Sequence, residues 1–187
     1  MHDPVLYVPL GAAVLILIWI ALTYNGLVRL RNTCKESWAG VDTELKRRYD
    51  LIPNLVETVR GYAQHERETL SRVVEARTRA VASSGSPGSQ ARDENALVDS
   101  LRQLFAVVER YPDLKASGNF LKLQEELTDT EDRIQAARRF YNANARDLNN
   151  RIEVIPSNLI AYLFGFTLEE FFEIENVTQR AAPEVKM

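Results

Sequence analysis

The residues best suited to chemistry in this 187-residue chain are carboxylates gathered in one short stretch. That stretch contains Glu125, Glu126, Asp129, Glu131 and Asp132. Carboxylate-bridged metal sites in helical bundles also need Glu-x-x-His pairs that project inward from two helices. Neither of the two histidines lies in such a pair. We therefore expect a solvated helix face, with the acids paired to Arg133 and Arg138, and no bound metal or cofactor.

Other catalytic patterns are also absent from the sequence. His65-Glu66 is followed at position 69 by Thr69, so the chain lacks the HExxH zinc-binding pattern. There is no phosphate-binding loop, nucleophile elbow or dinucleotide-binding fingerprint. The net charge of −3 and the pI near 5.5 give no general attraction for nucleic acid. We expect a protein that is not an enzyme and binds no nucleic acid.

Three consecutive basic residues, Lys46, Arg47 and Arg48, form a candidate structural or partner-docking patch. Lys46 lies 22 residues beyond Tyr24, which is roughly 33 Å along a helix. Screened charges act over only about 8 Å at physiological salt, so lipid headgroups are an unsuitable partner. We expect pairing with acids on a neighbouring helix, with partner docking as the alternative.

Cys34 is the single cysteine, so an internal disulfide cannot form. It shares an apolar helical stripe with Leu30 and Trp38, which favours core packing over lipid modification. Four asparagines (Asn142, Asn144, Asn149 and Asn150) lie in a later helical stretch. They indicate either a register-fixing interface or a polar binding face.

These side chains follow an uncharged run, Val5–Tyr24, long enough to cross a bilayer. The run has no basic residue before it and exceeds the length of a signal-peptide core, so we expect a retained anchor. Arg29, Arg31 and Lys35 flank only its C-terminal side. The positive-inside rule then predicts a single-pass protein of the cell membrane, with its N-terminus outside and its bulk in the cytoplasm.

Apolar residues at steps of three and four continue from the run as far as Ile52. At Asp50–Asn54 the chain either turns or kinks around Pro53, and segment length favours a turn. Further helices are expected up to a Ser/Gly-rich loop at 83–89, then up to Pro112, and from about Asn119 to Ile152. The predicted fold is all-α: an N-terminal transmembrane helix that continues into an up-and-down antiparallel four-helix bundle.

The C-terminal part is unusually apolar. Its candidate membrane-proximal residues are Leu159, Tyr162, Leu163, Phe164, Phe166, Phe171 and Phe172. The sequence Thr167-Leu168-Glu169-Glu170 resembles a capping box that opens a short helix. We expect this segment to plug the bundle core, with membrane or partner contact as the alternative. The predicted domains are 1–24 (tail and transmembrane helix), 25–155 (cytoplasmic bundle) and 156–187 (apolar segment and tail).

Four strings in order resemble the LemA family of bacterial membrane proteins: YNGLVRLRNT, ELKRRYDLIPNLVETVRGYAQHE, YPDLKASGNFLKLQEELTDTEDRIQAARRFYN and RIEVIPSNLIAYLFGF. The resemblance extends from the apolar run to about Phe172. It implies one membrane helix followed by a cytoplasmic four-helix bundle, with no catalytic residues to carry over. One branch of the family is associated with magnetosome membranes.

We therefore expect an interaction or scaffold module held to the bilayer by Val5–Tyr24. Its protein partner is unknown, and a homo-oligomer is one option. The alternative is a lipid-contacting protein of membrane remodelling or envelope stress.

Overall fold

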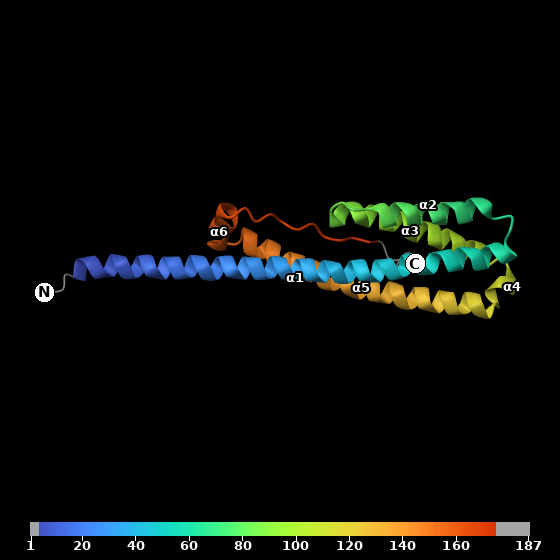
Figure 1. Ribbon diagram of the computed structural model, residues 1–187, viewed down its shortest axis with the longest axis horizontal. Helices are drawn as coiled ribbons and strands as arrows, with labels where there is room; N and C mark the ends of the chain where they lie inside the picture. Colours follow the sequence, from blue (N-terminus) through green and yellow to red (C-terminus); the bar gives the residue numbers. More distant parts are fainter. Residues whose placement is uncertain (1–3, 175–187) are drawn as a thin grey trace, which may run out of the picture. The chain divides into compact units, whose positions relative to one another are not determined.

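The computed structural model describes the backbone of residues 4–174 and the side chains of residues 9–174. Within this range all regular structure is helical, which confirms the all-α class. The helices are α1 (Pro4–Tyr62), α2 (Arg67–Ala82), α3 (Pro87–Val108), α4 (Pro112–Lys115), α5 (Gly118–Glu153) and α6 (Ser157–Leu163) (Figure 1). Residues 175–187, the end of the predicted segment 156–187, lie outside the described residues.

α1 is a 59-residue helix that begins apolar and exposed and becomes packed further along. Leu15, Leu17 and Leu22 are exposed, whereas burial starts at Thr23 and Leu27. Among the described helices, α1 is the one long and apolar enough to cross a membrane, with a mean hydropathy of 2.0 in its apolar window. The expected candidate membrane span is confirmed.

The predicted turn at residues 50–54 is wrong, because α1 continues through Pro53. Proline lacks the N–H that would bond the carbonyl four residues earlier, here that of Tyr49. Arg77 of α2 replaces this donor, with its Nε 2.8 Å from the Tyr49 carbonyl oxygen. The helix therefore loses no buried hydrogen bond at the proline, and the chain turns later, between α1 and α2.

The remaining helix boundaries follow the predicted punctuation. The predicted loop at 83–89 does separate α2 from α3 but is shorter, residues 83–86, because α3 starts with Pro87 at its first position and Ser86 as its N-cap. The chain breaks again before Pro112, and α5 ends before Pro156. The Ile155–Pro156 peptide bond is cis. Ser157 then donates to the carbonyl oxygens of Arg151 and Val154, which closes the end of α5.

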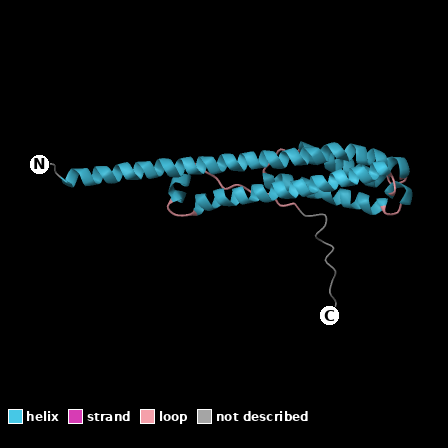
Figure 2. Ribbon diagram, turned by 90° about the horizontal axis from the view of Figure 1, so that it is seen from below, coloured by secondary structure: helices cyan, strands magenta, loops and turns pink. Residues whose placement is uncertain are grey.

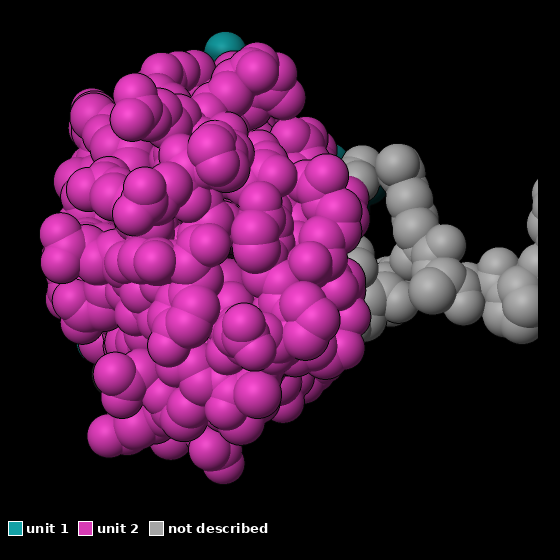
Figure 3. Space-filling view, turned by 90° about the vertical axis from the view of Figure 1, so that its right-hand side faces the viewer, with its two compact units in different colours: residues 1–38, 140–169 teal, residues 39–139, 170–187 magenta. Residues whose placement is uncertain are grey.

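The chain divides into two compact units, unit 1 (residues 1–38 and 140–169) and unit 2 (residues 39–139 and 170–187). The predicted domain boundaries at residues 24/25 and 155/156 stay predictions. In unit 2, parts of α1, α2, α3 and α5 lie side by side and are joined by short connections, as expected of an antiparallel bundle (Figure 2). Leu45, Ile52, Leu97 and Leu104 are fully buried among them. Figure 3 shows the end of unit 2 that carries the α1–α2 turn.

Unit 1 combines the first part of α1 with the last part of α5 and with α6 (Figure 1). Trp38 of α1 packs on Tyr141 of α5, with ring centroids 5.1 Å apart. Leu27, Cys34 and Leu148 are also buried in this unit. The apolar stripe that runs out of the uncharged segment is therefore the packing face of α1.

The short helix predicted from the capping box at residues 167–170 is wrong, because residues 166–174 contain no helix. Asn149 holds the backbone of Glu169 in place: its Oδ1 accepts from the Glu169 N–H at 2.8 Å and its Nδ2 donates to the Glu169 carbonyl at 2.9 Å. In unit 2, the Glu170 carboxylate accepts from Ser86 Oγ (2.6 Å) and from the Gly88 N–H (3.2 Å). Glu169 and Glu170 therefore bond to α5 and to the start of α3, and they do not cap a helix of their own.

Candidate functional site

The three consecutive basic residues do not form one surface patch. Lys46 is exposed and pairs within α1 with Asp42, at 2.6 Å. Arg47 is exposed as well. Arg48 is only 2% exposed and faces the interior of unit 2. Because successive side chains of an α-helix point about 100° apart, neighbours in the sequence have different environments.

Arg48 lies at the centre of a buried polar network. One of its guanidinium nitrogens contacts Glu94 of α3, and the other lies 2.9 Å from Glu131 of α5. The Tyr49 hydroxyl donates to the same Glu94 carboxylate, which is fully buried. Burial, followed by the charge of Glu94, raises the pKa of Tyr49 well above its usual range, so the hydroxyl remains a donor.

The network corrects the expectation of a fully solvated acidic face. Glu131 turns inward to Arg48, and Arg138 donates to the backbone carbonyl of Ile174. A small cavity of about 170 Å³ borders Arg48 and has largely apolar walls. The described residues contain no group of three His, Cys, Asp or Glu placed to hold a metal ion. A paired, hydrogen-bonded ion cluster of this kind links α1 to α3 and α5.

The apolar C-terminal residues divide into buried and exposed groups. Phe172 is fully buried in unit 2, where Phe171 is partly exposed. In unit 1, Phe164 and Phe166 pack on Tyr24, the last residue of the uncharged run, with ring centroids 4.7 and 6.0 Å away. Three further residues of this segment are exposed on α6: Leu159, Tyr162 and Leu163. One segment therefore supplies both core packing and exposed apolar surface.

Gly165 directs the two phenylalanines towards Tyr24. Its φ of 68° lies in the left-handed region, which glycine adopts without strain. The Gly165 N–H bonds the Tyr162 carbonyl and the Phe166 N–H bonds the Ala161 carbonyl, at 3.2 and 2.9 Å. These two bonds are the Schellman arrangement that ends many helices. The Phe-Gly-Phe sequence is the signal that could have located this turn.

Cys34 is buried in unit 1, as its stripe predicts. Burial, followed by the charges of Glu169 and Asp147, raises the pKa of its thiol to about 11. The thiolate is the reactive form of cysteine. Cys34 is therefore a packing residue and a poor nucleophile.

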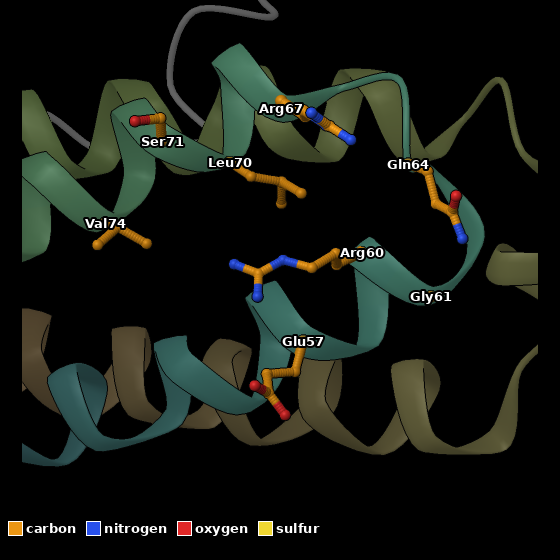
Figure 4. A pocket seen from close by; sticks show the side chains of 8 residues that line it. All are labelled: Glu57, Arg60, Gly61, Gln64, Arg67, Leu70, Ser71 and Val74. Carbon is orange, nitrogen blue, oxygen red and sulfur yellow. The ribbon is translucent and has the colours of Figure 1, made fainter.

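An open groove of about 830 Å³ lies between the end of α1 and the start of α2 (Figure 4). Arg60 extends between the two helices, and Arg67 and Glu57 lie at the rim. Val74 is exposed along the same groove. This groove could not be anticipated from the sequence, because it forms at the turn between Tyr62 and Arg67, whereas the turn was expected at residues 50–54.

Known proteins are similar to this chain over most of its length. The LemA family model matches residues 37–187, most of the chain. The chain belongs to the LemA family. It is 29% identical over 157 residues to Protein LemA of Metamycoplasma hominis, covering 82% of this chain and 71% of that protein.

Two further LemA-family relatives are named Magnetosome protein MamQ. The one from Paramagnetospirillum magneticum (MamQ 2) is 27% identical over 179 residues, and the one from Magnetospirillum gryphiswaldense is 25% identical over 178 residues. Each alignment covers 82% of this chain but only 66% and 65% of the respective relative. The chain thus spans about two-thirds of these relatives, and none of the three names describes a catalytic activity.

Proposed function

We propose that this LemA-family chain is a membrane-anchored scaffold without catalytic activity, which holds an acidic protein partner at the cytoplasmic face. The continuity of α1 carries the proposal: one helix extends from the apolar segment into both compact units. A chain built this way positions a folded domain at a membrane surface with no flexible tether. The magnetosome relatives, by name, belong to a defined cellular assembly, where such a role is useful.

The groove between α1 and α2 is the docking surface in this proposal. Its two arginines outnumber its single glutamate, so it favours acidic side chains. Val74 and the partly apolar walls offer contact area for an apolar anchor residue. The occupant is therefore an amphipathic helix with acidic residues beside its apolar face.

A photo-crosslinking amino acid at Ser71, inside the groove, tests the docking surface in living cells. We expect an adduct with another protein at Ser71 and none at Asp129, which is exposed on α5. Arg60→Glu with Arg67→Glu is expected to reduce the adduct, whereas Arg79→Glu on the same helix α2 leaves it unchanged. Equal yields at Ser71 and Asp129, or an adduct between two copies of this chain, would overturn the acidic-partner assignment.

The proposed topology has a separate test. Arg29, Arg31 and Lys35 follow the span on one side, which favours a cytoplasmic location for the bulk of the chain. Protease added to sealed inverted membrane vesicles is then expected to digest the helical units. Full protection of the units in intact inverted vesicles, with digestion after detergent is added, would reverse the topology.

A further inference from the structure

The segment 154–168 has no charged residue and exposes several large apolar side chains. The exposed fractions are 79% for Ile155, 65% for Leu159, 90% for Tyr162 and 71% for Leu163. Apolar patches of this kind on soluble monomers usually mark an interaction site. We therefore expect another molecule to bind this segment and bury its apolar side chains.

The exposed side chains occupy one face of α6. Leu159, Tyr162 and Leu163 follow the i, i+3, i+4 spacing of a single helix face. The opposite face carries Ile160 and Ala161, which are buried in unit 1. A solvated surface helix has a polar outer face, whereas α6 is apolar on the packed side and on the outer side.

The contacts of Tyr24 fix the level of this segment along α1. Tyr24 is the last residue of the twenty-residue run Val5–Tyr24 and is followed by polar Asn25, five residues before the first charge at Arg29, so it lies near the place where the span leaves the hydrocarbon. Phe164, one residue after α6, packs directly on its ring. The outer face of α6 lies within about two helical turns of chain from this contact, or roughly 10 Å. It is thus beside the end of the span.

Charged groups border the segment without entering it. The Arg31 guanidinium lies 5.0 Å from the centre of the Phe166 ring, and Arg151 is exposed before α6. Glu153 and Glu169 bound the segment on either side. Arginine next to an aromatic ring suits the headgroup level, where the charge stays hydrated and the ring lies among apolar groups.

We propose that residues 154–166 form a second membrane contact, an interfacial foot in which the outer face of α6 lies within the lipid interface beside the span. The occupant is the lipid of the leaflet from which α1 emerges. Continuity with the exposed apolar surface of α1 favours lipid over a protein partner. Insertion of about 5–10 Å is typical of such interfacial segments, and a tyrosine such as Tyr162 suits this depth. The inference rests on the proposed function only in requiring that α1 spans the membrane.

Spin labels on the full chain, reconstituted into vesicles of phosphatidylcholine and phosphatidylglycerol, test the foot. The labels are attached at Tyr162→Cys or Leu163→Cys in a Cys34→Ala background, with Ala143→Cys on α5 as an exposed control in unit 1 and Leu15→Cys as a control in the span. Collision with oxygen reports lipid, and collision with a water-soluble nickel chelate reports water. We expect the oxygen-to-nickel ratio at both foot positions to be severalfold higher than at Ala143 but lower than at Leu15, because Leu15 lies near the middle of the span and the foot lies at the interface.

Each of the other possible results contradicts one specific part of the proposal. Water-like ratios at the foot with a lipid-like ratio at Leu15 would refute the foot and leave the anchor intact. A water-like ratio at Leu15 would refute the anchor itself. Labels shielded from both collision partners, and released when labelled chain is diluted with unlabelled chain, would show that a second copy covers α6. If the Cys34→Ala background does not fold, the same cysteines are introduced into the chain that keeps Cys34, because the buried Cys34 thiol reacts slowly with the label.

Discussion

Replacing Arg48 with alanine is expected to destabilise unit 2 far more than replacing either basic neighbour. The variant leaves Glu94, fully buried, without its cation. Breaking a buried ion pair from one side costs about 3–5 kcal/mol. Lys46 and Asp42 form an exposed i, i+4 pair, which contributes at most about 1 kcal/mol. Arg47→Ala removes an exposed side chain, with an effect of about 0.5 kcal/mol or less.

Thermal unfolding of the three variants in detergent micelles, followed by circular dichroism, measures this difference. For a chain of this size, 1 kcal/mol corresponds to about 2–4 °C in Tm. Arg48→Ala is then expected to lower the Tm by roughly 6–20 °C, against about 4 °C or less for Lys46→Ala and Arg47→Ala. The three substitutions remove the same formal charge, so the comparison isolates burial.

A double substitution tests the cause. Arg48→Met with Glu94→Gln removes both charges of the pair, and apolar or neutral replacements of buried ion pairs are often tolerated. We expect the double variant to be more stable than Arg48→Ala alone. A Tm for Arg48→Ala within 2 °C of that for Lys46→Ala, a difference of about 1 kcal/mol or less, would refute the assignment of a buried ion cluster.

Three further predictions concern hydrogen bonds and titration. Arg77→Ala should cost about 1–3 kcal/mol, because it leaves the Tyr49 carbonyl without a donor. Pro53→Ala restores the N–H that bonds this carbonyl and should reduce that cost; equal costs in both backgrounds would contradict the account. Asn149→Ala should lower stability by about 1–3 kcal/mol through its two backbone bonds, whereas exposed Asn150→Ala should change little in the same unfolding assay. The raised pKa of Cys34 disfavours the thiolate in the folded state, so the contribution of this thiol to the free energy of unfolding is full below pH 9.0 and is lost as the pH rises towards about 11. Denaturant unfolding at several pH values in this range should show a fall in the free energy of unfolding with pH that is smaller in Cys34→Ala. Rapid thiol alkylation of the folded chain at pH 8 would contradict the burial.

The fold class could be predicted because apolar periodicity is a local property of the sequence. The stripe of α5, with Phe120, Leu127, Ile134 and Tyr141, is buried at each of these positions. Pro53 was misjudged because local rules treat proline as a helix breaker. The donor that compensates for it, Arg77, is on another helix, and only the folded chain brings the two together.

The polar network shows the same limit. Helical phase places Arg48 beside the buried positions Leu45 and Ile52, so its burial could have been anticipated. Its partner Glu94 lies 46 residues away. Glu94 likewise shares the helical phase of the buried residues Leu97 and Leu101, but local periodicity does not show that these two charged side chains face each other. The capping-box pattern at residues 167–170 failed for a related reason, because Asn149 takes the backbone that a helix would have used.

The unbroken α1 also sets the rotational phase of the apolar segment. Leu27 and Cys34, two turns apart, are both packed in unit 1, and each residue of an α-helix turns the side chains by about 100°. The packing of unit 1 therefore decides which stripe of the apolar segment faces which direction in the plane of the bilayer. Insertion of one residue after Asn25 would rotate that stripe by about 100°, slightly more than a quarter of a turn. If another helix packs on this segment inside the membrane, the face available to it is therefore set by the packing of α1 outside the membrane.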